Sequence, residues 1–106
     1  MIQEHEIVLY QVEDTNICVN VVFKDETFWM TQKAMAELFD VNVPAISKHL
    51  SNIFEEGELF KEATVSKMEI VQMEGNRKVK REPEFYNLDA IIAVGYRVNS
   101  KKATRF

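Results

Sequence analysis

The sequence contains few of the residues on which disulfides, metal sites and membrane spans depend. Its 106 residues include one cysteine and two separated histidines, which exclude an internal disulfide and give no metal-ligand spacing. No apolar run reaches the roughly 18 residues of a membrane span, and the N-terminus has no signal-peptide pattern. We therefore expect one cytoplasmic domain over residues 1–106, with no cofactor, no metal and no contact with a membrane.

Positive charge is also scarce, but only in the first part of the chain. Residues 1–62 hold four basic and twelve acidic side chains, net −8, and residues 63–106 hold nine basic and five acidic, net +4. The two parts sum to the overall net charge of −4. Because Lys and Arg supply affinity for phosphates, any nucleic-acid contact should depend strongly on the second part.

Alternating apolar residues predict a small antiparallel sheet at the N-terminus. Residues 7–10 and 17–23 predict a β-hairpin around a polar break, and residues 27–30 a short third strand. Cys18 has apolar neighbours and no adjacent cation, so it predicts a packed hydrophobe in preference to a nucleophile. Phe28 and Trp29 are expected to anchor the core, with base stacking as the alternative.

Residues 31–56 have the pattern of two short helices joined by a tight turn. Thr31 is the expected N-cap of the first helix, and Asn42 caps a second helix that runs to about Glu56 and stops at Gly57. Ala36 is small enough to let the two helices cross closely. At Asp40, where such turns often have glycine, the side chain tolerates a left-handed conformation better than most residues do.

The second helix is expected to bury one face and to present a short polar face to DNA. The side chains predicted to be buried are Ile46, Leu50, Ile53 and Phe54. The side chains predicted to contact DNA are Ala45, Ser47, Lys48, Ser51 and Asn52. Short side chains allow close approach to a major groove, amides read adenine and ammonium groups bind guanine or phosphate. An ordinary solvated helix is the alternative. His49 at its flank is expected to be packed and hydrogen-bonded, with a base contact as the alternative.

A second hairpin is predicted from strands at 65–73 and 79–86, with Gly75-Asn76 in a type II′ loop. The side chains predicted to contact DNA as a basic wing are Arg77, Lys78, Lys80 and Arg81. The alternative is a solvated hairpin tip. Asn87 then caps a final apolar helix at 88–97, and a third basic group suits phosphate contact and solubility equally well. That group consists of Arg97, Lys101, Lys102 and Arg105.

These elements predict an α+β fold: a winged helix-turn-helix-like domain with an N-terminal β-hairpin in a small antiparallel sheet, a basic β-hairpin wing and a final helix. Four stretches resemble the RhuM family of bacterial virulence-associated proteins: residues 27–32, 35–50, 52–59 and, most specifically, 85–100. The resemblance implies a DNA-binding protein, often encoded near restriction-modification or mobile-element genes and similar in plan to the N-terminal domains of phage antirepressors. Family members continue beyond Phe106, so it also implies that this chain is the N-terminal domain of a longer protein.

We therefore expect sequence-specific binding of double-stranded DNA by a transcriptional or mobile-element and defence-associated regulator. A homodimer formed through regions beyond residue 106 would supply a second recognition helix. The carboxylates of the 55–62 connector have no histidine nearby, so no enzyme is expected. The alternative is a winged-helix protein-interaction module without DNA affinity, because the acidic half would repel a duplex that it faced. Duplex binding through three to five cations predicts a log K against log salt slope of about −3 to −4.

Overall fold

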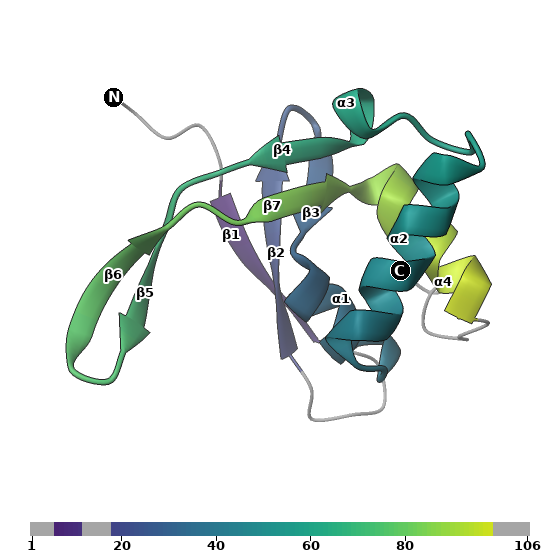
Figure 1. Ribbon diagram of the computed structural model, residues 1–106. Helices are drawn as coiled ribbons and strands as arrows, with labels where there is room; N and C mark the ends of the chain where they lie inside the picture. Colours follow the sequence, from purple (N-terminus) through teal and green to yellow (C-terminus); the bar gives the residue numbers. More distant parts are fainter. Residues whose placement is uncertain (1–5, 12–17, 99–106) are drawn as a thin grey trace.

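The computed structural model describes residues 6–11 and 18–98 (Figure 1), and these residues confirm the predicted α+β class. In chain order the elements are β1 (Glu6–Gln11), β2 (Cys18–Lys24), β3 (Thr27–Met30), α1 (Gln32–Phe39), α2 (Val43–Glu55), α3 (Lys61–Thr64), β4 (Val65–Lys67), β5 (Ile70–Glu74), β6 (Arg77–Arg81), β7 (Glu84–Asn87) and α4 (Leu88–Val98). The single turn α3 is not predicted by the sequence pattern. None of the described helices is long and apolar enough to cross a bilayer.

Five strands form an antiparallel sheet in the order β1-β2-β3-β7-β4. The predicted hairpin at the N-terminus is confirmed as β1 paired with β2, although the polar break at 13–16 lies outside the described residues. β7 lies between β3 and β4, with Met30 opposite Tyr86 and Val65 opposite the same residue on the other side. The sheet therefore joins the start of the helical segment to the end of the second hairpin.

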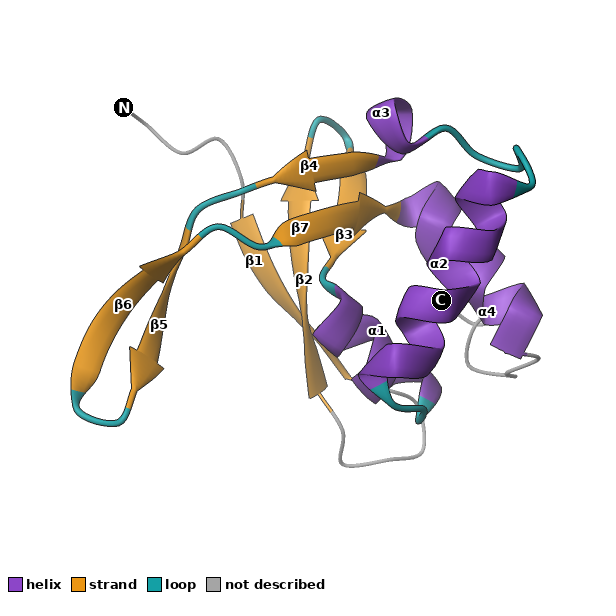
Figure 2. Ribbon diagram, viewed as in Figure 1, coloured by secondary structure: helices purple, strands orange, loops and turns teal. Residues whose placement is uncertain are grey.

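The two strands predicted at 65–73 and 79–86 are each interrupted, so their predicted continuity is wrong. The inner halves, β4 and β7, belong to the main sheet, whereas β5 and β6 form a separate two-stranded sheet that projects from the body (Figure 2). Pro83 lies at one break, has no N–H for a strand ladder and accepts a hydrogen bond from the Met68 N–H at 3.4 Å. At the same break the Met68 side chain is buried in the smaller apolar cluster of the sheet.

All three predicted N-caps are confirmed by side-chain hydrogen bonds. Thr31 Oγ1 accepts from the Ala34 N–H at 3.1 Å, Asn42 Oδ1 from the Ala45 N–H at 2.8 Å, and Asn87 Oδ1 from the Ala90 N–H at 3.2 Å. Each oxygen satisfies a backbone donor that the first turn of a helix leaves unpaired. The expected stop of α2 is also confirmed, because the chain turns at Gly57 with φ +77°.

Successive strand residues point to opposite faces of the sheet, and each face has its own apolar cluster. The larger cluster packs the helices on one face and includes Val21, Met30 and Tyr86, together with buried residues of α1, α2 and α4. The smaller cluster, on the other face, consists of Val22, Trp29, Met68 and Phe85, with Ile70 against it. The hairpin thus leaves the body from the smaller core.

Two aromatic residues before α1 were predicted to anchor the core. The prediction is confirmed for Trp29 and wrong for Phe28. Trp29 is buried, and its Nε1–H donates to the Lys24 carbonyl at 2.9 Å. Phe28 is exposed and packs edge-to-face on Phe23, its cross-strand neighbour, with ring centroids 5.3 Å apart. Cys18 begins β2, and its side chain lies outside what is described.

Candidate nucleic-acid interface

The α1–α2 corner has the backbone conformation that the sequence predicts. Asp40 is left-handed, with φ 57° and ψ 49°, and its N–H donates to the Ala36 carbonyl. The Val41 N–H donates to the same carbonyl at 3.0 Å, and the Val41 side chain packs against the main core. These contacts fix the direction in which the chain leaves α1 and enters α2.

α2 is buried along one face and open along the other. Ile46, Leu50 and Ile53 are buried and Phe54 is half-buried, which confirms the predicted inner stripe. Among the predicted DNA contacts, Ser47, Lys48 and Ser51 are exposed, while Ala45 and Asn52 are half-buried. In Figure 1, α2 lies in front of α4, and no described helix or strand covers it.

His49 departs from its prediction. The side chain is half-buried, in keeping with its place at the flank of the apolar stripe. The side chain forms no hydrogen bond with any residue in the part of the chain that is described. The prediction that it is hydrogen-bonded is therefore wrong for these residues.

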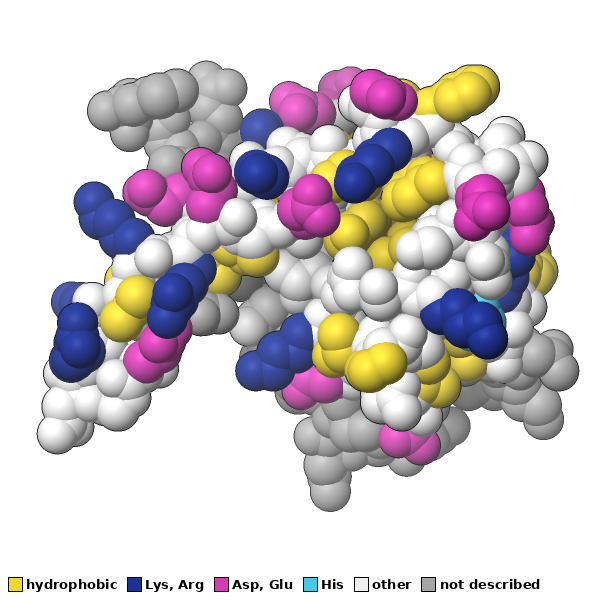
Figure 3. All heavy atoms as spheres, viewed as in Figure 1, with side chains coloured by type: hydrophobic (Ala, Val, Ile, Leu, Met, Phe, Trp, Pro, Cys, Tyr) yellow, Lys and Arg dark blue, Asp and Glu magenta, His cyan; other side chains and the backbone are white. Residues whose placement is uncertain are grey.

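The β5–β6 hairpin carries the predicted cations on exposed positions. Arg77, Lys78, Lys80 and Arg81 are all exposed. Gly75 has φ +67° and Asn76 is not in the left-handed region, as a type II′ loop requires. Figure 3 shows Lys and Arg side chains on this projecting hairpin with an acidic side chain beside them, and acidic and basic side chains mixed over the rest of the same face.

The four hairpin cations are not equivalent, because Arg81 is engaged by Glu74. Its Nε and Nη2 donate to the two carboxylate oxygens at 2.9 and 2.7 Å. This hydrogen bonding lowers the pKa of Glu74 and raises the pKa of Arg81. Arg77, Lys78 and Lys80 form no ion pair with a residue in the described ranges, so their charges stay available.

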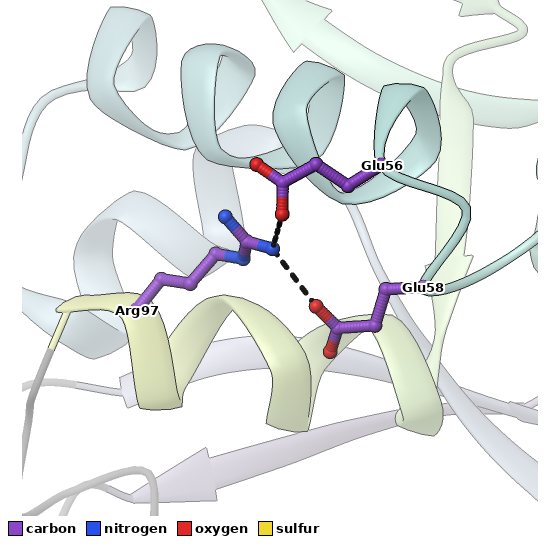
Figure 4. A network of polar contacts seen from close by, with 3 residues as sticks. All are labelled: Glu56, Glu58 and Arg97. Carbon is purple, nitrogen blue, oxygen red and sulfur yellow. Dashed lines mark hydrogen bonds and ion pairs between the residues drawn. The ribbon is translucent and has the colours of Figure 1, made fainter.

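A second ion-pair group joins α4 to the C-terminal end of α2 (Figure 4). Arg97 Nη2 donates to Glu56 Oε1 at 2.7 Å and to Glu58 Oε1 at 2.9 Å. The hydrogen bond from Arg97 holds the pKa of Glu56 below its usual value. Sequence reasoning missed this contact, because the partners lie 41 and 39 residues apart. Arg97 therefore connects α4 to the end of α2. The other members of the third basic group, Lys101, Lys102 and Arg105, lie outside the described residues.

A hollow of about 200 Å³ lies between the base of the hairpin and the body. Its apolar wall includes Val22, Val71 and Phe85, and Lys33 and Glu37 of α1 stand at its edge. A shallower hollow lies at the α1–α2 turn, beside Asp40 and Asn42. Within residues 6–11 and 18–98, no group of three or more His, Cys, Asp or Glu side chains is placed to hold a metal ion.

The described chain is thus an α+β domain with an exposed helical corner and a separate cationic hairpin. Residues 63–106 match the family described as the Virulence protein RhuM family, which confirms the predicted resemblance over that segment. The matched segment contains β4 through α4, including the hairpin, and the α1–α2 corner precedes it. Comparison with curated proteins found no match, and comparison with solved structures found none either.

Proposed function

We propose that this chain binds duplex DNA, with the N-terminal half of α2 in the major groove and the β5–β6 hairpin on the neighbouring backbone. The observation that carries the proposal is the two-sided character of α2. Ile46, Leu50 and Ile53 fix the helix on the core, while Ser47 and Lys48 in its N-terminal half, and Ser51 one turn further on, remain exposed. A helix that reads bases in the major groove needs short polar side chains in its N-terminal half.

The strand order supports a winged helix-turn-helix reading of this surface. Following α1 and α2, the chain enters the sheet as β4, leaves it as the β5–β6 hairpin and returns as β7 between β3 and β4. A helical corner followed by a hairpin that extends from the sheet is the arrangement a winged helix-turn-helix would have. In Figure 1 the hairpin and α2 are both visible from one side, with α1, β4 and β7 between them.

The net charge of −4 would repel the phosphates of DNA, and the ion pairs reduce this repulsion. Glu56 and Glu58, at the C-terminal end of α2, are paired with Arg97. The cations without an ion pair in the described residues include Lys48, Arg77, Lys78 and Lys80. If three or four of these cations each neutralise one phosphate, log K should fall with log salt at a slope of about −2.7 to −3.6, since each contact contributes roughly 0.9.

The same chemistry suits a regulator that acts by binding, without catalysis. One recognition helix contacts too few base pairs to select a genomic site, so we propose that two copies act together on paired half-sites. A transcriptional regulator, or one associated with mobile elements or defence, would use the domain in this way.

Fluorescence anisotropy of the chain with a random-sequence duplex pool at low salt tests the proposal. Lys48→Ala should weaken binding and alter the selected sequence, because its side chain would face bases or adjacent phosphates. Lys61→Ala is the matched control, since Lys61 is an exposed lysine on α3 with no ion pair in the described chain. Titrations with the unsubstituted chain that stay flat at low salt would overturn duplex binding.

One observation favours a protein-interaction module as the second candidate. Phe60 beside α3 and Tyr96 on α4 are 72% and 71% exposed, and Ile92 lies one turn before Tyr96 on the same helix. Exposed aromatic side chains are common anchors of protein interfaces. Flat DNA titrations together with loss of a partner upon Tyr96→Ser would favour this candidate.

A further inference from the structure

The β5–β6 hairpin has two chemically different faces. Residues directly opposite each other share a face in an antiparallel pair, and Val71 lies opposite Lys80 while Met73 lies opposite Lys78. We call these four residues the lysine face. The alternate positions place Ile70 opposite Arg81 and Glu74 opposite Arg77 on the other side. Within the hairpin, the Arg81–Glu74 ion pair thus belongs to the opposite face, and the lysine face has no carboxylate.

The apolar residues of the lysine face are not used by the fold. Val71 and Met73 are 60% and 64% exposed, although both are large apolar side chains. Ile70, on the opposite face, packs against the smaller core. The hairpin is therefore attached through the Ile70 side, which leaves an exposed apolar stripe on β5 beside a lysine stripe on β6.

The base of the lysine face lies beside the helical corner. Val71 lines the hollow of about 200 Å³ together with Lys33 and Glu37 of α1, and Ile70 of the opposite face lines it as well. α1 leads directly through Asp40 into α2. A duplex seated on α2 would therefore lie close to the base of the hairpin.

The geometry points to the lysine face as a contact for one edge of a DNA groove, an inference that rests on the proposed duplex binding. Lys78 and Lys80 lie two residues apart on one strand, about 6.6 Å along it, and bind phosphates of one DNA strand. Val71 and Met73, on the neighbouring strand, pack on the sugars that line the groove inside those phosphates. The lysine stripe suits the phosphates at the edge of a groove, and the apolar stripe beside it suits the sugars. Because this face of the hairpin has no carboxylate, it does not repel the phosphates.

Salt-dependent anisotropy with a duplex separates the two faces. Lys78→Gln with Lys80→Gln should reduce the slope of log K against log salt by about 1.8. The loss of affinity should then be about twelvefold larger at about 50 mM than at about 200 mM salt. A matched control changes two lysines elsewhere: Lys24→Gln with Lys61→Gln, on the β2–β3 turn and on α3, should leave the slope unchanged.

Two further variants test the faces without changing the net charge. Glu74→Gln with Arg81→Gln removes the ion pair of the opposite face and should leave the affinity within about twofold, since neither group would face phosphate. Val71→Thr with Met73→Thr keeps residues that favour strands and should lower the affinity about tenfold without changing the slope. Unchanged melting temperatures verify that each variant is folded.

The outcomes distinguish this inference from the proposed function. An unchanged slope for the double lysine variant, with Lys48→Ala still weakening binding, would overturn the lysine face and leave duplex binding standing. An equal loss in the Glu74/Arg81 double variant would also overturn it, because the opposite face would then be in contact. Absence of any duplex binding by the unsubstituted chain would overturn both.

Discussion

The first turn of α2, on which the proposed groove contact depends, is held by the side chain of Asn42. Its Oδ1 accepts from the Ala45 N–H at 2.8 Å, and its backbone is extended, as an N-cap requires. Asn42→Ala removes this acceptor, and loss of such a cap costs about 1 kcal/mol, within a range of roughly 0.5–2. For a domain of about this size, 1 kcal/mol corresponds to a fall in Tm of about 4–8 °C.

Thermal unfolding followed by circular dichroism measures this change, and hydrogen exchange of the Ala45 amide locates it. Asn42→Ser is the matched control, because serine caps about as well as asparagine and should preserve most of the stability. Asn42→Ala should also weaken duplex binding, since the fraying turn carries Ser47 and Lys48 close behind it. Equal melting temperatures for the alanine and serine variants would refute the reasoning.

Three further predictions concern the corner and the ion pair that hold α2. Ile46→Ala should cost about 2–5 kcal/mol in denaturant unfolding, whereas Ile46→Val should cost about 0.5–1.5, because the side chain is fully buried; equal losses would argue against a tight corner. Asp40→Val should melt below Asp40→Gly, since φ 57° disfavours a β-branched residue; the reverse order would contradict the left-handed turn. Glu56→Gln should lower the Tm at pH 7, because the contact with Arg97 lowers the pKa of Glu56 and stabilises the fold while the carboxylate is charged. The difference in Tm between the two proteins should close as the pH falls below 4.5. A difference that persists in acid would exclude the Arg97 contact as its cause.

The helical corner was predictable from the sequence because its determinants are local. Thr31, Asn42 and Asn87 act on amides three residues away, and the left-handed turn at Asp40 depends on its own backbone and on Ala36. The buried stripe of α2 follows directly from helical periodicity. The same reasoning found the hairpin loop at Gly75, whose positive φ a glycine adopts without strain.

The interruptions of the second hairpin could not be read from strand periodicity. At one of them Met68 is buried with Trp29 and Phe85, and these partners lie far from it in sequence. The unequal roles of the cations also depend on contacts made by the folded chain. Arg97 meets Glu56 across two helices, and Arg81 reaches Glu74 only after β5 and β6 have paired.

The most direct test of the central claim is a map of backbone amide chemical shifts of the labelled chain during titration with a short duplex. Binding by α2 and the hairpin predicts that the largest shifts fall in residues 43–52 and 71–80, and that both groups of shifts fade together as salt is added. Shifts confined to other elements, or a spectrum unchanged by duplex at low salt, would contradict the account.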